Sequence, residues 1–221
     1  RSRLAAATEM TPKEEVFDDA AAAVDLLRKL PEIKGERIFV IGHSMGATLA
    51  PRMAQSIPKL GGIVMLAASA RPVADVVVEQ IAYLRTQPEN KSPEAQTKIA
   101  EIEAAAAKLK NLREDDAGFI LGAPVSYWRW WAGYDPLVEA AKLELPVLIL
   151  QGERDYQVTM TDFELWKKKL GGKANVTLKS YADLNHLFMT GKGRSKPAEY
   201  LAGGKVAAKV IDEIAAWIRS R

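Results

Sequence analysis

Apolar residues recur at two different spacings along this chain of 221 residues, and each spacing predicts one kind of element. Residues 12–30 form the first periodic segment, with apolar positions three and four apart on one face at Phe17, Ala20, Val24 and Leu27. This period predicts an amphipathic helix. We expect Thr11 to cap the helix, because Pro12 suits the first helical position and Glu14 completes a capping box.

Short apolar runs without alternation predict buried strands further along the chain. Residues 37–41 form one such run, which favours a strand buried on both faces of a parallel sheet. A helical stretch at 45–56 and a second apolar run at 63–66 follow, so the three segments predict a strand–helix–strand unit. The same alternation returns later, with expected strands at 147–150 and 176–178 and expected helices at 161–170 and 205–219.

The intervening part of the chain departs from this alternation and is predicted as a helical insertion. Its expected helices cover 73–84 and 93–112, and a short helix starts at about Asp135. An aromatic cluster lies near its end, formed by Tyr127, Trp128, Trp130, Trp131 and Tyr134. We therefore predict an α/β core of residues 1–71 and 146–221 with a helical cap of residues 72–145. The aromatic residues would line an apolar acyl or aryl pocket, or pack as ordinary core between cap and sheet.

Composition and charge narrow the classes of function. The chain has no cysteine, which excludes disulfides, cysteine nucleophiles and thiolate metal sites. Its 31 basic and 28 acidic residues are scattered, so the net charge of +3 indicates no nucleic-acid surface. No apolar run is long enough to cross a bilayer, and residues 1–10 lack the apolar core of a signal peptide. The composition is that of a soluble folded protein.

The strongest chemical signal is a glycine-bracketed serine directly between the first expected strand and the helix after it. Residues 42–46 are Gly-His-Ser-Met-Gly, the G-x-S-x-G pattern of a nucleophile elbow, which predicts Ser44 as the nucleophile. Small residues at Gly42 and Gly46 would leave room for backbone that a Cβ would block. The backbone N–H of Met45, at the start of the helix, would point toward a developing oxyanion. The alternative is a serine that only caps the helix.

A serine needs a base within hydrogen-bond reach to attack an ester at neutral pH. The chain has two histidines. We expect His43, beside the serine, to pack or to form a hydrogen bond, and we predict His186, after the last expected strand, as the base. The acid is expected in the loop after the preceding strand, where Asp155 stands farther past the strand end than Glu153. Asp183 is the alternative, although a carboxylate so near His186 in sequence more often caps its own turn.

These motifs resemble those of the α/β-hydrolase superfamily. More narrowly, they are similar to bacterial serine carboxylesterases related to dienelactone hydrolases and to the catalytic domains of acyl-aminoacyl and prolyl oligopeptidases. The resemblance covers most of the chain from Thr11 onward and is carried by Asp18-Asp19, residues 36–46, residues 150–155 and Asn185-His186. It implies a parallel sheet flanked by helices, no metal or organic cofactor, and a site made of Ser44, Asp155, His186 and the oxyanion donor Met45. Dienelactone hydrolases proper use cysteine, which this chain lacks.

The family pattern places several strands before the elbow strand, and this sequence offers no candidate for them. Only 36 residues precede Arg37, and most of them are predicted helix. The first glycine is Gly35, so the loop that normally supplies the second oxyanion donor has no candidate either. We therefore expect the N-terminal strands to be missing from this chain and an N-terminal fragment of the same protein to complete the sheet as a second chain. Localisation stays open, because an export signal would have left with that fragment.

The predicted function is a serine hydrolase that cleaves carboxylic esters of small molecules through an acyl-enzyme intermediate. Two alternatives stay open. One is a peptidase or amidase with the same triad, although no propeller-sized domain is present to filter peptides. The other is a non-catalytic relative that binds a small ligand or a partner, against which the complete set of serine, acid and histidine argues.

Overall fold

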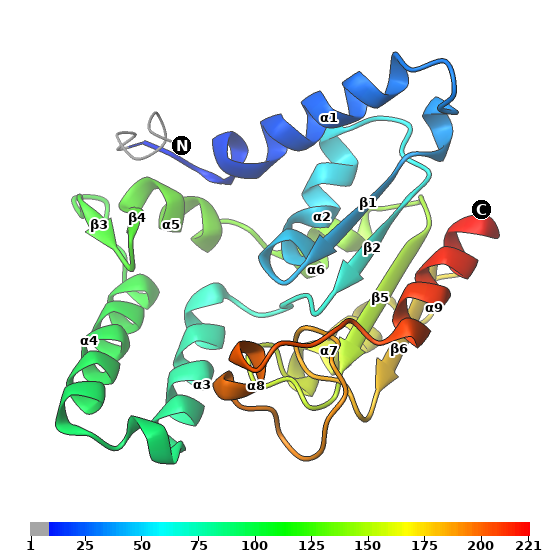
Figure 1. Cartoon of the computed structure of the whole chain (residues 1–221). Coiled ribbons are helices and arrows are strands. Elements are labelled where there is room, and N and C mark those ends of the chain that lie inside the picture. The colour runs from blue at the N-terminus through cyan, green and yellow to red at the C-terminus, as the bar shows by residue number, and fades with distance from the viewer. Residues whose placement is uncertain (1–8) are drawn as a thin grey trace. The chain divides into compact units, whose positions relative to one another are not determined.

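The computed structural model describes residues 9–221, which form two compact units (Figure 1). The unit that we call the helical unit contains the described residues up to Asp19 together with Arg71–Tyr134. The other, the α/β unit, contains Ala20–Ala70 and Asp135–Arg221. Most of the segment 1–10, in which the sequence shows no signal-peptide core, lies outside the described residues.

The predicted division into a core and a cap stays a prediction, and two segments cluster differently from it. Residues 9–19 belong to the helical unit, where Phe17 contacts Trp130 with their ring centroids 5.5 Å apart. Residues 135–145 belong to the α/β unit, where α6 (Pro136–Ala141) packs against α2 (Met45–Ser56) and α7 (Met160–Leu170). Gln55 of α2 donates a hydrogen bond of 3.0 Å to the backbone carbonyl of Glu139 and so links α2 to α6.

The α/β unit is built on a parallel sheet with the strand order β1-β2-β5-β6. Its strands are β1 (Phe39–His43), β2 (Gly62–Leu66), β5 (Val147–Gly152) and β6 (Val176–Tyr181). In the register, Val40 pairs with Ile63, Val64 with Leu148, and Leu148 with Thr177. The four strands predicted from apolar runs are therefore confirmed, each shifted or lengthened by a few residues at its ends. The parallel sheet flanked by helices is confirmed with them.

The residues of the inner strands β2 and β5 are more deeply buried than those of β1. All residues of β5 are buried, and so are four of the five in β2. In β1, Phe39 and Val40 are only half-buried and Ile41 is 51% exposed. The expectation that this strand is buried on both faces is wrong for the described residues. The reason is that β1 forms the edge of the sheet, where side chains have neighbouring strands on one side only.

Helices cover both faces of the sheet. Alternate strand residues point to opposite faces, so Val64, Leu148 and Leu150 share one face, where they form a core with Val210 and Trp217 of α9 (Ala208–Arg219). The described helices of this unit are α2 (Met45–Ser56), α6, α7 (Met160–Leu170), α8 (Pro197–Leu201) and α9, together with α1 (Asp18–Arg28) from Ala20 onward. The predicted helices at 45–56, 161–170 and 205–219 are confirmed, the last beginning three residues later. The short helix α8 was not predicted.

The first predicted helix is confirmed with a different beginning. A π-helical turn, Lys13–Phe17, leads into α1 (Asp18–Arg28). The Thr11 backbone N–H and hydroxyl both donate to the Glu14 carboxylate, at 2.9 and 2.6 Å. Lys13 N donates to Thr11 Oγ1 at 3.2 Å. The Thr11–Glu14 capping pair is therefore formed, although the chain enters the helix through a wider turn than the periodicity indicates.

The helical unit contains α3 (Val73–Thr86), α4 (Pro93–Lys110) and α5 (Val125–Ala132), with a small hairpin of β3 (Phe119–Ile120) and β4 (Ala123–Pro124). The helices predicted at 73–84 and 93–112 are confirmed. The hairpin was missed, because strands of two residues are too short to show a period. Among the described residues, no helix has the length and apolar character that crossing a membrane requires.

Candidate active site

The turn between β1 and α2 has the geometry of a nucleophile elbow. Ser44 lies between the last residue of β1 and the first of α2, with φ of 54° and ψ of −117°. Positive φ is costly for a residue with a Cβ, so other bonds must hold it. Ser44 N donates to Leu66 O at 2.8 Å, and Thr48 N donates to Ser44 O at 3.0 Å. The strained serine predicted from the motif is therefore present.

The two glycines of the motif differ in what they make possible. A Cβ on Gly42 would lie 2.4 Å from the carbonyl oxygen of Gly46, so only glycine fits there. A Cβ on Gly46 would meet nothing within 4 Å. The expectation that Gly46 is small to leave room for backbone is therefore wrong, because the backbone of Gly46, not its missing side chain, makes the close approach.

His186 and Asp155 form a buried pair in the α/β unit. His186 Nδ1 lies 2.6 Å from Asp155 Oδ2. The other carboxylate oxygen, Oδ1, accepts from Gln157 N at 2.7 Å and from Val158 N at 3.1 Å. Both side chains are almost fully shielded from water. The carboxylate is thus fixed in orientation and holds the imidazole by Nδ1, which leaves Nε2 available for proton transfer.

The two other acidic candidates are engaged elsewhere. Asp183 forms an exposed ion pair with Lys209 at 2.5 Å, and this hydrogen bond lowers the pKa of Asp183. Glu153 accepts a hydrogen bond of 2.7 Å from the Ser180 hydroxyl. The structure therefore brings Asp155, and neither Glu153 nor Asp183, to the ring of His186.

The sequence model of the serine aminopeptidase S33 family matches residues 6–192 of this chain. This match includes the elbow, Asp155 and His186. The chain belongs to the serine aminopeptidase S33 family. The resemblance to α/β-hydrolases that the motifs indicated is confirmed.

Relatives of known sequence and structure agree with this family. Esterase EstD from Thermotoga maritima is 40% identical over 211 residues, which are 96% of this chain and 49% of that protein. The chain thus spans about half the length of this curated relative. A structure from the metagenome-derived lipolytic enzymes LipS and LipT has a TM-score of 0.55 at 18% identity, covering 100% of this chain and 77% of that chain. For the monoacylglycerol lipase of Paleococcus ferrophilus the TM-score is 0.50 at 18% identity, with 96% and 76% covered. These structural likenesses show the fold.

In this S33 family chain, His43 connects the elbow with the turn that carries His186. His43 Nε2 lies 2.8 Å from the carbonyl oxygen of His186, and the two rings lie 4.7 Å apart. A carbonyl oxygen only accepts, so Nε2 carries the proton and donates. Partial burial of the ring lowers the pKa of His43, which favours the neutral form. His43 is thus the hydrogen-bonding residue that the sequence predicted, and it brings the elbow beside the His186 turn.

The predicted oxyanion donor lies at the first position of α2. Met45 follows Ser44 directly and begins the helix. The first turn of a helix carries the positive end of its dipole, which favours a negative charge there. The location of Met45 suits its predicted role, which stays a prediction.

Within residues 9–221, no three histidine, aspartate or glutamate side chains gather as a metal site would need.

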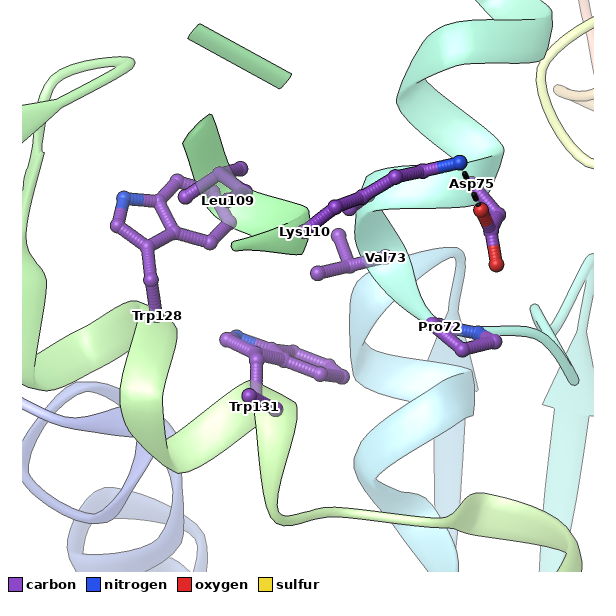
Figure 2. A pocket seen from close by; sticks show the side chains of 9 residues that line it. Pro72, Val73, Asp75, Leu109, Lys110, Trp128 and Trp131 are labelled. Carbon is purple, nitrogen blue, oxygen red and sulfur yellow. Dashed lines mark ion pairs between the residues drawn. The ribbon is translucent and has the colours of Figure 1, made fainter. Parts of the chain in front are cut away.

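The five aromatic residues of the S33 family chain form one cluster in the helical unit, and two of them line a described cavity. Trp130 stacks on Tyr134 at 4.9 Å, and Tyr127 contacts both Trp128 and Trp131. Figure 2 shows Trp128 and Trp131 on a cavity of about 370 Å³, together with Val73 and Leu109. The Lys110–Asp75 ion pair, 2.5 Å long, lies at its polar side. Tyr127, Trp130 and Tyr134 do not line this cavity.

Proposed function

We propose that this chain carries the nucleophile, acid and base of a serine esterase that cleaves carboxylic esters. The observation that carries this proposal is the buried contact of 2.6 Å between His186 Nδ1 and Asp155 Oδ2, in the same unit as a strained Ser44 at the end of a parallel strand. His43 supports the same assignment, because it links the segment before Ser44 to the backbone of His186.

The proposed reaction proceeds in two halves. His186 Nε2 accepts the proton of Ser44 as Oγ attacks the ester carbonyl carbon, and the backbone N–H of Met45 donates to the resulting oxyanion. The tetrahedral intermediate collapses, and the alcohol leaves with the proton from His186. Water then attacks the acyl-enzyme with His186 again as base, which releases the carboxylic acid and restores Ser44. Asp155 holds the ring and stabilises its cation, so the mechanism uses no metal or organic cofactor.

The choice between ester and peptide substrates is tested directly. EstD is an esterase by name, whereas the family is named for aminopeptidases. We favour the ester, and the test compares p-nitrophenyl esters with aminoacyl p-nitroanilides on the same preparation of the chain complemented by an N-terminal fragment. Faster hydrolysis of the anilides would assign the chain to the peptidase alternative. Binding of either substrate without turnover would assign it to the non-catalytic alternative.

We further propose that the cavity of the helical unit receives the acyl or aryl group of the substrate, with Trp128 and Trp131 as its aromatic walls. Val73→Phe places a ring in this cavity. It is expected to lower kcat/KM for long-chain esters relative to the acetate by about tenfold, because a filled pocket cannot accept the extra methylenes. The measurement is kcat/KM across p-nitrophenyl esters of increasing chain length.

Val78→Phe is the matched control, because Val78 lies on the same helix, α3, but does not line the cavity. If Val73→Phe lowers kcat/KM equally for all chain lengths, or if both variants show the same change in chain-length preference, the cavity does not bind the substrate. The five aromatic residues would then be the packed core of the helical unit.

An N-terminal fragment of the same protein, present as a second chain, stays part of the proposal. Among the described residues β1 pairs with β2 alone, and an unpaired strand edge favours the addition of another strand. Residues 1–221 alone are expected to be poorly soluble or inactive toward short-chain esters, because no residue of the described part of the chain is assigned as the second oxyanion donor. Co-expression with an N-terminal fragment that contains several buried strands is expected to restore activity. A soluble monomer of this chain alone with kcat/KM of about 10⁴ M⁻¹s⁻¹ or above would contradict this.

A further inference from the structure

One carboxylate connects the residue before the acid with the residue before the base. Arg154 directly precedes Asp155, and Asn185 directly precedes His186. Arg154 Nη2 donates to both oxygens of Glu199, at 2.8 and 2.9 Å. Asn185 Nδ2 donates to Glu199 Oε2 at 3.3 Å. Glu199, on the short helix α8, therefore contacts the loops of both proposed catalytic residues without belonging to either.

Asn185 shapes the turn on which His186 lies. Its Oδ1 accepts from Leu187 N and from Met189 N, each at 3.0 Å, so the side chain closes the turn around the histidine. The turn also lies directly on the end of β5, where a Cβ on Gly152 would come within 2.5 Å of the Leu184 carbonyl oxygen. Asn185 is fully buried. Its amide nitrogen therefore depends on Glu199 for the partner that fixes its rotamer.

Arg154 fastens a longer segment to the acid loop. Its Nε donates to Gly193 O at 2.6 Å and its Nη2 to Lys192 O at 3.2 Å, while Ser195 N donates to Arg154 O at 2.8 Å. The Arg154 side chain is 5% exposed and that of Glu199 29% exposed. A buried guanidinium needs its carboxylate partner, because without it the charge stays uncompensated in a medium of low dielectric. Both carboxylate oxygens lie within hydrogen-bond distance of Nη2, so the contact combines charge with hydrogen bonding.

We infer that Glu199 is a positioning residue of the proposed esterase. Through Arg154 and Asn185, it fixes the position of the Asp155 loop relative to the His186 turn. The inference rests on the proposed function. Proton transfer from Ser44 requires the imidazole at a defined distance and angle, and a displacement of about 1 Å costs on the order of 10²-fold in rate. The backbone hydrogen bond from Arg154 N to Leu184 O, 3.0 Å long, keeps the two loops adjacent. Glu199 then restricts the rotamers of Arg154 and Asn185, the residues that precede Asp155 and His186.

Glu199→Gln tests this role, because it keeps the shape of the side chain while removing the charge and one acceptor oxygen. We expect kcat for p-nitrophenyl acetate to fall on the order of tenfold with KM within about twofold, and labelling of Ser44 by a fluorophosphonate to slow by the same factor. The downfield proton resonance of the His186–Asp155 hydrogen bond is expected to shift or broaden. A residue that only stabilises the fold would lower Tm and leave these three readouts of the folded protein unchanged.

Asp183→Asn is the matched control. It removes an exposed ion pair with Lys209 from the same loop that carries His186, and it is expected to leave all three readouts unchanged. If Glu199→Gln does not fold, Glu199→Asp replaces it, since it keeps the charge beside Arg154 and withdraws the oxygens by one methylene. Wild-type rates and resonance in the folded variant would overturn the inference. If the wild-type protein neither turns over nor labels, alone or complemented by the N-terminal fragment, the proposed function is overturned. The resonance would still decide whether Glu199 positions His186.

Discussion

Ser44→Ala is expected to lower the turnover of short-chain esters by about 10⁴-fold or more, because it removes the only oxygen that the elbow presents for attack. The fold is expected to persist. Serine and alanine have a similar conformational strain at φ of 54°, because both have a Cβ. The hydrogen bonds that hold this turn use the backbone of Ser44, which the substitution keeps. The measurement is kcat/KM for p-nitrophenyl acetate, in whichever form hydrolyses it, the chain alone or the complemented chain.

A fluorophosphonate provides the independent readout for the nucleophile. The wild-type protein is expected to gain one adduct, mapped to Ser44 by mass spectrometry, and Ser44→Ala is expected to gain none. Ser126→Ala is the control, because the Ser126 hydroxyl donates to the Met10 carbonyl within the helical unit and has no proposed role in the bond-making steps. An adduct on Ser69 or Ser126, or full activity in Ser44→Ala, would show that the elbow is not the site of attack.

Asp155→Asn is expected to lower kcat by about 10⁴-fold with little change in KM, because an amide facing Nδ1 favours the wrong tautomer of His186. The variant should fold, since its remaining oxygen can still accept from Gln157 N and Val158 N. The measurement is kcat and KM on p-nitrophenyl acetate, with Tm to confirm folding.

Asp183→Asn separates this prediction from the rival assignment. Asp183 pairs with Lys209 on the surface, where water screens the ion pair, so its loss is expected to change kcat by less than about twofold. The reverse ranking of the two variants would assign the acid to Asp183. Similar small losses in both would mean that His186 acts without a carboxylate partner.

Local patterns were sufficient for most of the elements. Apolar runs located β2 and β5, because a strand shielded on both faces needs apolar residues at every position. The period of three and four located α3 and α4. The hairpin of β3 and β4 and the short helix α8 were missed, since two to five residues are too few to show a period.

The proposed triad was accessible to sequence reasoning because its chemistry imposes an order on the chain. A serine at a strand-to-helix turn, an acid after a later strand and a histidine after the last strand follow from the fold, so Asp155 and His186 could be paired across 31 residues. The aromatic cluster shows the limit of such reasoning. Its five members were equivalent in sequence, and only packing decided that Trp128 and Trp131 line the cavity while three do not.

The sequence by itself determined the order of most strands and helices and the elbow at Ser44, because periodicity and the motif depend on residues that are near one another in the chain. It also predicted Asp155 and His186 as acid and base, from the chain order of the motifs. The tertiary structure alone decided that Gly42, and not Gly46, needs to lack a Cβ, and that Glu199 connects Arg154 with Asn185. Arg154 and Glu199 stand 45 residues apart with no motif between them. A contact of this kind depends on how loops fold back over the end of the sheet, which no spacing along the chain encodes.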